Sequence, residues 1–398
     1  MDIFVIVGAG LAGAKAAEAL RTQGFVGVVV LVGEETHLPY ERPPLSKDFL
    51  AGNAEQEGFT VHERRWYEDK DIDLRLGTTV TAVDRTAHQL ELSDGSRLDY
   101  TKLLLATGSS PRTIEGADPA KVHYLRTVDD AIRLRAELKN EARVVVIGAG
   151  WIGLEVTAAA RQAGAEVTVL EYAELPLLRV LGPEVANVFK ALHEEHGVDM
   201  RFNARVTAIT ENAVHLADGT VVEANAIVVA VGAAPNTALA EAAGLDVDNG
   251  ILVDASLRTS DPDIYAVGDV ANEEHPILGQ RVRVEHWANA LNQPATAAKA
   301  MQGEPVEYDE LPYFYTDQYD LGMEYIGHAD PGAYDRVVFR GDVATREFIA
   351  FWLQDNKIKA GMNVNVWDVV DPVKALIKSG RTVDPAKLAN PDVPLDEV

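Results

Sequence analysis

The stretch Gly8-Ala9-Gly10-Leu11-Ala12-Gly13 decides the fold, and the chain carries it twice, since it returns as Gly148-Ala149-Gly150-Trp151-Ile152-Gly153. A second pattern is repeated as well: Ala106-Thr107-Gly108-Ser109-Ser110-Pro111 returns as Ala230-Val231-Gly232-Ala233-Ala234-Pro235. Because two separate patterns recur in the same order, the repeats are whole structural units rather than chance local matches.

Each glycine motif stands between an expected strand and an expected helix. The first follows the apolar run 3–7 and opens a helix of small residues over 14–20, and the second follows 144–147 and opens a helix that continues through Ala159. Glycine permits the tight turn, the close approach of a pyrophosphate and close helix packing, and the helix N-terminus offers N–H groups to the phosphates. Each copy therefore predicts a dinucleotide site, the second at Gly148, Gly150, Ile152 and Gly153.

An acidic residue follows the next strand of each copy, Glu34 after 28–32 and Glu171 after 167–170. Such a carboxylate typically hydrogen-bonds ribose hydroxyls. Glu171 would also repel a 2′-phosphate, and the next residues, Tyr172 to Glu174, include no arginine. The second site is thus predicted to take NADH. NADPH stays the less favoured alternative because Arg179 lies further along.

Composition favours a soluble, cytoplasmic enzyme. A length of 398 residues is enough for two or three domains, and a hydrophobic content of 47% supports full cores. No uninterrupted apolar stretch approaches the length of a membrane span. The N-terminus runs directly into the first strand, without the basic region of a signal peptide. A net charge of -26 argues against nucleic-acid binding. We expect no metal site, and either a monomer or a homodimer.

Cysteine is absent from the chain. A redox-active disulfide or a cysteine sulfenic acid therefore cannot carry electrons, which excludes disulfide reductases and thiol-dependent peroxidases. Electrons must leave a bound flavin directly, for a one-electron carrier, a quinone-like molecule or oxygen.

The repeats predict an α/β fold with two Rossmann-like dinucleotide-binding domains and an α+β C-terminal domain. The apolar strand 264–267 follows the second copy, so we expect the chain to return and complete the first domain. In the C-terminal domain, turns are expected at Gly341-Asp342 and Asp355-Asn356 and a helix at 373–378. The expected boundaries are 1–110 and 236–309 for the first domain, 111–235 for the second and 310–398 for the C-terminal one.

Several motifs together resemble the FAD-dependent ferredoxin reductases of bacterial oxygenase systems, along the whole chain and in order. The most specific is Arg42-Pro43-Pro44-Leu45-Ser46-Lys47, and the others lie at 106–108, 148–155, 259–269 and 317–320. The resemblance implies a glutathione-reductase-like arrangement of the two nucleotide-binding domains. One position departs from the family, because Tyr315 stands where many members have tryptophan.

The resemblance assigns FAD to the first site. It implies that the pyrophosphate is held by Gly8, Gly10, Ala12 and Gly13, and that the adenosine end lies at Glu34 and Val80. The phosphates and the flavin would be approached by Arg42 and Lys47, and the cofactor would also contact Thr107, Gly108 and Arg126. Asp269 would accept a hydrogen bond from a ribityl hydroxyl, and Trp287 would line the flavin edge. At the second site, Gly232 joins the pyridine-nucleotide residues.

Glu155 lies two positions beyond Gly153, inside the first turn of the expected helix. A carboxylate there can simply stabilise the helix N-terminus. The resemblance instead pairs Glu155 with Lys47 against the nicotinamide. These two residues are our candidates for catalysis, through orientation and electrostatics rather than covalent chemistry.

The leading functional hypothesis is an NADH-dependent reductase of a small iron–sulfur protein, either a ferredoxin or a rubredoxin. Residues 336–381 hold eight Lys or Arg against five Asp or Glu, a local excess suited to an acidic partner. Two alternatives stay open. One is an NADH-binding signalling flavoprotein like apoptosis-inducing factor, and the other is an NADH:quinone or dye reductase.

Overall fold

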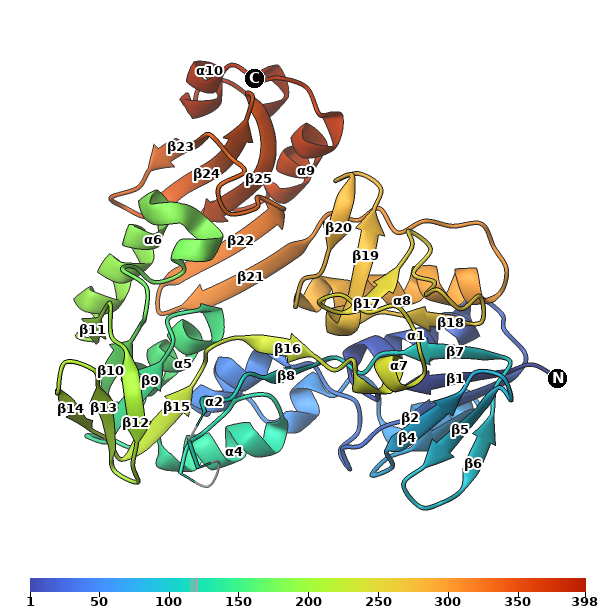
Figure 1. Ribbon diagram of the computed structural model, residues 1–398. Coiled ribbons are helices and arrows are strands. Elements are labelled where there is room, and N and C mark those ends of the chain that lie inside the picture. Colours follow the sequence, from blue (N-terminus) through green and yellow to red (C-terminus); the bar gives the residue numbers. More distant parts are fainter. Residues whose placement is uncertain (116, 119–120) are drawn as a thin grey trace. The chain divides into compact units, whose positions relative to one another are not determined.

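A computed structural model describes residues 1–115, 117–118 and 121–398 (Figure 1). The chain divides into two compact units, each described by itself. The first comprises 1–42, 56–110 and 233–312, and the second comprises 43–55, 111–232 and 313–398.

The first unit is built on a parallel sheet with strand order β18-β7-β1-β2-β3. Its strands are β1 (Ile3–Val7), β2 (Val28–Val32), β3 (Ile72–Arg75), β7 (Lys102–Leu105) and β18 (Ile264–Ala266). β1 lies between β7 and β2, and Val5 and Ile6, which point to opposite faces of the sheet, are both fully buried, as the continuous apolar run predicts. Ile264 pairs with Leu103, which confirms that the chain returns to this sheet after the second copy.

Helices α1 (Leu11–Thr22) and α8 (Trp287–Met301) pack against each other in the first unit. Small side chains fill this contact, and Ala16, Ala17, Ala297 and Ala298 are all fully buried. Alanine at these positions lets the two backbones approach closely. Helix α8 is thereby held against the helix that the first glycine motif opens.

Smaller elements complete the first unit. A three-stranded antiparallel sheet, β4-β5-β6, turns at Asp94-Gly95, with Gly95 at φ +81°. The remaining bounds are η2 (Gln56–Phe59), α3 (Arg64–Asp69), β4 (Val80–Asp84), β5 (Gln89–Leu92), β6 (Arg97–Asp99), α7 (Ala238–Ala242), β17 (Ile251–Val253), η3 (Gly268–Val270), β19 (Ala271–His275) and β20 (Gln280–Val282).

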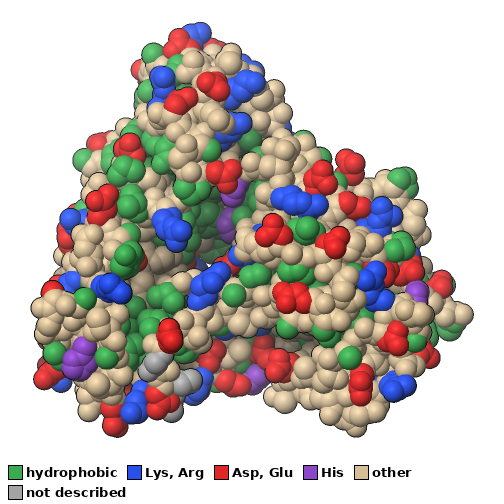
Figure 2. All heavy atoms as spheres, in the orientation of Figure 1, with side chains coloured by type: hydrophobic (Ala, Val, Ile, Leu, Met, Phe, Trp, Pro, Cys, Tyr) green, Lys and Arg blue, Asp and Glu red, His purple; other side chains and the backbone are tan. Residues whose placement is uncertain are grey.

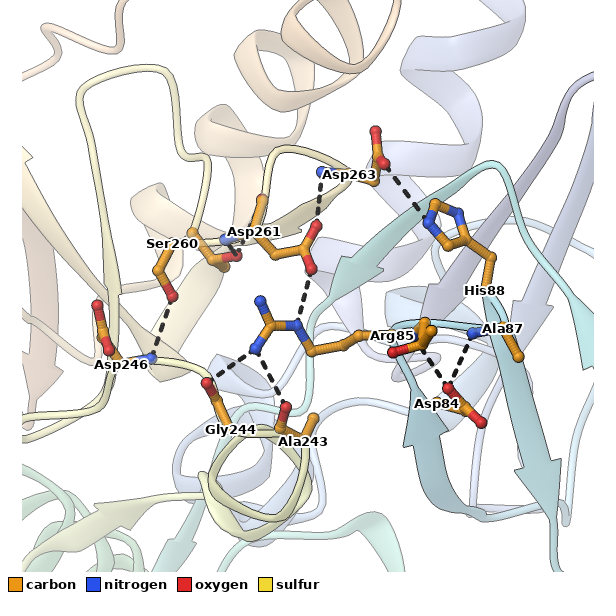
Figure 3. A network of polar contacts seen from close by, with 12 residues as sticks. Asp84, Arg85, Ala87, His88, Ala243, Gly244, Asp246, Ser260, Asp261 and Asp263 are labelled. Carbon is orange, nitrogen blue, oxygen red and sulfur yellow. Dashed lines mark hydrogen bonds and ion pairs between the residues drawn. The ribbon is translucent and has the colours of Figure 1, made fainter.

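A polar network anchors this small sheet within the first unit (Figure 3). The Arg85 guanidinium donates to Asp261 Oδ2 at 2.7 Å and to the carbonyl of Gly244 at 2.9 Å. Asp263 lies next to this pair, because its backbone N–H donates to Asp261 Oδ1 and its carboxylate accepts from Lys102. One arginine thus ties the end of β4 both to the end of α7 and to the turn before β18.

The second unit repeats the first sheet with the order β11-β10-β9-β15. Its strands are β9 (Arg143–Ile147), β10 (Glu166–Leu170), β11 (Asp199–Arg201) and β15 (Ala226–Val229), and all pair in parallel. A second three-stranded sheet accompanies it, made of β12 (Val206–Ile209), β13 (Ala213–Leu216) and β14 (Val221–Glu223). The sequence repeat is therefore a structural repeat.

The C-terminal part of the second unit is an antiparallel sheet with order β21-β22-β25-β24-β23. Its strands are β21 (Tyr313–Gln318), β22 (Leu321–Gly327), β23 (Arg336–Asp342), β24 (Glu347–Gln354) and β25 (Lys357–Val364). The predicted turn at Asp355-Asn356 is confirmed, and both residues have positive φ. The predicted helix appears as α9 (Val370–Ser379).

The predicted turn at Gly341-Asp342 is wrong, because β23 continues through both residues. Gly341 adopts φ +106°, and a Cβ there would lie 2.5 Å from the carbonyl oxygen of Glu347 on β24. Glycine is needed at this position for close contact with the partner strand, which its turn propensity alone did not reveal.

Other elements of the second unit are η1 (Pro43–Ser46), α2 (Asp48–Ala51), α4 (Val128–Glu137), α5 (Trp151–Gln162), α6 (Leu178–Glu195), α10 (Pro385–Ala389) and η4 (Leu395–Glu397). Within α6, Gly182 has φ 76° and interrupts the helix. The nearby Leu181 carbonyl accepts a hydrogen bond from the buried Trp352 indole, which joins α6 to β24. Two short strands, β8 (Ser109–Pro111) and β16 (Ala233–Pro235), pair with each other where the chain leaves and re-enters the first unit.

These topologies confirm the α/β class with two Rossmann-like sheets and an added C-terminal sheet. The compact units group 43–55 and 313–398 with 111–232, so the three predicted domain boundaries stay a prediction. No helix among the described residues is long and apolar enough to cross a membrane. Acidic and basic side chains are mixed over the face shown in Figure 2.

Glu273 on β19 generates a prediction about stability and pH. The side chain is 1% exposed, and burial raises its pKa to about 8, while Gln293 Nε2 donates to Oε2 at 2.9 Å. The folded protein therefore holds a proton that the unfolded chain releases above about pH 4.5, so this group lowers stability as the pH rises toward 8. Glu273→Gln should remove the loss and stabilise the protein by on the order of 3 kcal/mol at about pH 8.

Urea unfolding at about pH 4.5 and about pH 8 measures this difference. The exposed neighbour Glu274→Gln is the matched control and should show no such pH dependence. An equal effect of Glu273→Gln at both pH values would contradict the prediction.

Candidate active site

The first glycine loop combines two glycines required by the fold with one that faces open space. Gly8 has φ +112°, and a Cβ there would lie 2.1 Å from the Ala106 carbonyl oxygen at the end of β7. A Cβ on Gly13 would lie 1.9 Å from the Gly8 oxygen. Gly10 has nothing within 4 Å of the equivalent position. The backbone near Gly10 is thus open to a ligand, which fits a pyrophosphate.

The second loop repeats this geometry. A Cβ on Gly148 would lie 2.3 Å from the Ala230 oxygen, one on Gly153 would lie 2.2 Å from the Gly148 oxygen, and one on Gly150 would meet nothing within 4 Å. Ile152, in the first turn of α5, is 46% exposed. Both loops therefore present an open backbone cradle at a helix N-terminus, as a dinucleotide requires.

Asp269 lies at the carboxyl edge of the first sheet, directly after β18 and in the 3-10 turn η3. Ser109 Oγ donates to Asp269 Oδ2 at 2.7 Å, and the Gly268 N–H donates to Gln293 Oε1 at 2.7 Å. A Cβ on Gly268 would touch that of Ala12 at 3.4 Å. The structure thus brings Asp269 to the first glycine loop, as the site prediction requires.

Thr107 and Gly108 follow β7 at the same edge. Thr107 Oγ1 donates to the carbonyl of Asn236 at 2.9 Å, and the Asn236 N–H donates to the carbonyl of Gly108 at 2.9 Å. Gly108 adopts φ +68°. These bonds fix the turn beside Gly8.

Arg42 is held by two residues of the segment that follows β2, Glu35 and Tyr40. Its guanidinium donates to Glu35 Oε1 at 2.8 Å and to the Tyr40 hydroxyl at 3.2 Å, and it interacts electrostatically with Asp269. Trp287, the first residue of α8, donates its indole N–H to Glu41 Oε2 at 3.0 Å. Glu41 thereby contacts the start of α8, and the neighbouring Arg42 is attracted electrostatically by Asp269.

Two predicted FAD contacts lie apart from these interactions. Glu34 is exposed, and Val80 is buried in the core at the start of β4, 8% exposed. The position equivalent to Glu171 in the first unit is Gly33, because Gly33 N–H and Glu171 N–H both donate to the strand alongside, at Arg75 and Arg201. The first acid thus comes one residue later than the second, a shift that the sequence spacing conceals.

Glu171 lies at the second loop. Its carboxylate accepts the Ala149 N–H at 2.7 Å and the Ala173 N–H at 2.8 Å. Tyr172 beside it is 76% exposed. Gly232, at φ +102°, follows β15 and is exposed as well. Arg126 lies before α4, and its backbone N–H donates to Asp130.

The predicted pair of Lys47 and Glu155 forms within the second unit. Lys47 Nζ lies 2.9 Å from Glu155 Oε2, with the two side chains 15% and 6% exposed. Lys47 precedes α2, and Glu155 is on the first turns of α5, two short elements that pack together. A buried carboxylate is costly unless it is paired and hydrogen-bonded, so its presence here favours a specific role over simple helix capping.

Two further residues complete the pair, and sequence reasoning gave them no role. Ser46 Oγ donates to Glu155 Oε2 at 2.5 Å, and Thr316 Oγ1 donates to Oε1 at 2.6 Å. Ser46 belongs to the motif that contains Lys47, and Thr316 directly precedes the motif at 317–320. A single sequence carries no signal that joins residues 161 positions apart.

Tyr315 also lies close to Lys47. Lys47 Nζ is 5.5 Å from the centre of the Tyr315 ring, within the range of a cation–π contact. The phenol thus keeps the aromatic face that the family's tryptophan would offer. Among the described residues, no group of three or more His, Cys, Asp or Glu side chains is arranged to hold a metal ion.

Two open glycine cradles on two Rossmann-like sheets, with a buried lysine–glutamate pair, define a dinucleotide-dependent oxidoreductase. The chain belongs to the pyridine nucleotide-disulphide oxidoreductase family, which matches residues 2–294. Residues 313–398 match a second family, described as reductase C-terminal.

Similar proteins include the ferredoxin–NAD(+) reductase component of the anthranilate 1,2-dioxygenase system of Burkholderia cepacia, 45% identical over 99% of this chain and 98% of that protein. Putidaredoxin reductase of Pseudomonas putida is 40% identical over 100% of this chain and 96% of that protein. The predicted resemblance to ferredoxin reductases of oxygenase systems is confirmed.

Two solved structures are similar over the whole chain. The putidaredoxin reductase in its covalent complex with putidaredoxin has a TM-score of 0.95 and 40% identity, covering 100% of this chain and 97% of that one. The ferredoxin reductase for the CYP199A2 system of Rhodopseudomonas palustris has a TM-score of 0.95 and 36% identity, covering 100% and 99%.

The glycine loops give a prediction that separates folding from binding. Gly10 and Gly150 have ordinary φ values of -84° and -80° and open space at Cβ, so alanine should fold normally at either position while blocking its cradle. Gly10→Ala should purify with little FAD. Gly150→Ala should stay yellow and be reduced by dithionite but hardly by NADH.

Gly13→Ala is the contrasting control. Alanine usually favours a helix over glycine, but here its Cβ would collide with a backbone carbonyl, which should cost roughly 3 kcal/mol in a thermal or urea melt. Normal FAD content in folded Gly10→Ala would contradict the assignment of this cradle.

Proposed function

We propose that this protein is an FAD-dependent reductase that oxidises NADH and passes electrons one at a time to a ferredoxin serving an oxygenase. The observation that carries the proposal is the buried Lys47–Glu155 pair in a protein with two open dinucleotide cradles. The names of the similar proteins support the same activity, since they are ferredoxin–NAD(+) reductases and a putidaredoxin reductase. Rubredoxin is a second candidate acceptor of the same chemical class.

FAD, when bound, supplies the hydride-accepting and single-electron-donating chemistry, which no side chain of this protein can provide. The first glycine loop would hold the pyrophosphate with N–H groups at the start of α1. Asp269, whose carboxylate is oriented by Ser109, would accept a hydrogen bond from a ribityl hydroxyl. Arg42 adds positive charge near the phosphates, and Glu35 keeps its guanidinium in place.

Glu155 and Lys47 orient the nicotinamide. Glu155 accepts hydrogen bonds from Ser46 and Thr316 and forms an ion pair with Lys47, so its carboxylate is fixed before the nucleotide arrives. Such preorganisation lowers the entropic cost of reaching the reactive geometry. The Lys47 ammonium group stabilises the negative charge that develops beside it during transfer.

Electrons leave without a protein disulfide. Although the matching family is described by disulphide chemistry, this chain has no cysteine. The redox-active cysteine pair of disulfide reductases is therefore absent, and transfer must run directly to the external acceptor.

We also propose NADH as the preferred nucleotide, because the Glu171 carboxylate lies at the second glycine loop, where it accepts the Ala149 N–H and would hydrogen-bond the ribose hydroxyls of a nucleotide held there. A cytoplasmic location agrees with this choice, since NADH is supplied there.

As a monomer or homodimer the protein would present its C-terminal segment 336–381, with its excess of Lys and Arg, to an acidic ferredoxin.

Stopped-flow kinetics with defined acceptors tests the function. NADH should reduce the flavin rapidly, and a 2Fe-2S ferredoxin should reoxidise it much faster than a quinone or a dye does. A long-lived charge-transfer complex that resists ferredoxin would favour the signalling alternative. Fast turnover with quinones and none with ferredoxin would favour the quinone reductase.

Glu155→Ala should slow flavin reduction by NADH. The nicotinamide loses its orienting partner, and Lys47 loses its counter-charge at a mostly buried position, so we expect a decrease of roughly 100-fold in the limiting rate. Reduction by dithionite should be unchanged. Glu166→Ala, an exposed acid on β10, is the matched control. A wild-type rate in Glu155→Ala would remove this residue from the mechanism.

Glu171→Ala combined with Tyr172→Arg should shift preference from NADH toward NADPH. The change removes a carboxylate that repels the 2′-phosphate and adds a guanidinium that binds it. The ratio of kcat/KM values for the two nucleotides measures the shift, with the exposed Glu174→Ala as control. Wild-type protein that already prefers NADPH would show that the role given to Glu171 is wrong.

A further inference from the structure

The Glu155 carboxylate is one end of a continuous chain of hydrogen bonds within the second unit. Thr316 Oγ1 lies 2.6 Å from Glu155 Oε1, Gln318 Nε2 lies 3.2 Å from Thr316 Oγ1, and His193 Nε2 lies 2.8 Å from Gln318 Oε1. The Tyr319 hydroxyl lies 3.3 Å from His193 Nδ1. Four successive contacts thus connect Glu155 on α5 with β21 and with His193 on α6.

The charge of Glu155 determines the direction of every bond in this chain. A carboxylate paired with an ammonium group only accepts, so the Thr316 hydroxyl donates to it. Thr316 Oγ1 then accepts from the Gln318 amide NH₂, which turns the Gln318 oxygen toward His193. His193 must therefore donate from Nε2 and accept the Tyr319 hydroxyl at Nδ1.

The environment of His193 agrees with this direction. The side chain is fully buried, and desolvation lowers its pKa to about 4. A neutral imidazole has one N–H and one acceptor nitrogen, as the chain requires. Thr316 and Gln318 are each 1% exposed, so solvent does not compete for their hydrogen bonds.

Tyr319 shows that the outer end of the chain is maintained at a cost. It lies in the two-residue turn between β21 and β22 with φ +57°, a conformation that favours glycine or asparagine over a bulky residue. Its ring stacks on His196 at a centroid distance of 3.6 Å. A strained tyrosine in a hairpin turn suggests that its side chain is needed there.

We propose that Thr316, Gln318 and His193 are positioning residues that hold the Glu155 carboxylate, and through it Lys47, in the orientation that receives the nicotinamide. This inference rests on the proposed function, because it specifies how the same site is kept in register. The chain fixes the carboxylate oxygen that Lys47 and Ser46 do not contact. Without it, Glu155 keeps its charge partner but gains rotational freedom.

Thr316→Val tests the inner end of the chain. Valine keeps the shape and removes the hydroxyl, so the limiting rate of flavin reduction by NADH should fall roughly 10-fold or more. The dissociation constant for NADH should change much less, because the adenosine half supplies binding elsewhere. Thr316→Ser restores the hydroxyl and should recover most of the rate.

Thr157→Val is the matched control. Thr157 is a fully buried threonine on α5 whose hydroxyl donates to the Gly153 carbonyl and does not contact Glu155. Its replacement measures the general cost of losing a buried hydroxyl. Equal rate losses in Thr157→Val and Thr316→Val would overturn the proposal.

His193 tests whether the effect passes along the chain. His193→Gln keeps an amide donor in reach of Gln318 and should retain most of the rate, whereas His193→Leu should lower it in the same direction as Thr316→Val. A double variant of Thr316→Val and His193→Leu should be no slower than Thr316→Val alone, because both changes break one chain. Additive losses would contradict a shared path.

Nitrogen NMR of the histidine rings in wild-type holoenzyme provides a readout independent of activity. His193, assigned by loss of its signal in His193→Gln, should be the neutral Nε2–H tautomer at neutral pH. The opposite tautomer in the wild-type protein would overturn the chain, whatever the reduction rates of the variants. Wild-type protein that NADH does not reduce would refute the proposed function itself, whereas rapid wild-type reduction that Thr316→Val leaves unaltered would refute only the positioning chain.

Discussion

Close packing of backbone against backbone at the glycine loops is the constraint on which the rest of the structure depends. The carbonyl oxygens of Ala106 and Ala230 lie where Gly8 and Gly148 would carry a Cβ. Any side chain there would push the first helix of each sheet away from its neighbouring strand. Gly10 and Gly150 are open positions at the helix N-termini of the same loops, so each loop leaves room for a ligand at its helix N-terminus.

The two copies of this design have diverged where their ligands differ. Glu171 accepts two backbone N–H groups at the second loop, whereas the first copy has Gly33 at the equivalent place, with its position for Cβ 2.3 Å from that of Ala9. In the first unit, Glu35 instead accepts a hydrogen bond from the Arg42 guanidinium. The second copy therefore has a carboxylate bonded to its glycine loop, whereas the first unit pairs a carboxylate with an arginine.

The second unit stabilises a charge in its interior. Glu155 is 6% exposed and would be unfavourable without Lys47, Ser46 and Thr316, which come from two separate segments, the motif that ends at Lys47 and strand β21. The C-terminal sheet contributes through Thr316 at the buried face of β21. This sheet is therefore part of the candidate site, because Thr316 donates the hydrogen bond that orients Glu155 Oε1, the carboxylate oxygen that Lys47 and Ser46 do not contact.

The sequence by itself determined the strand–loop–helix repeats, the return of 264–267 to the first sheet, the absence of thiol chemistry and the Lys47–Glu155 pairing that the family resemblance implied. These follow from local periodicity, glycine geometry and motif order, which are written along the chain. The tertiary structure decided the roles of Ser46, Thr316 and His193, the one-residue shift between Glu34 and Glu171, and the strand position of Gly341. Each of these depends on which residues distant in sequence approach within hydrogen-bonding or van der Waals distance, and no local pattern in one sequence encodes that.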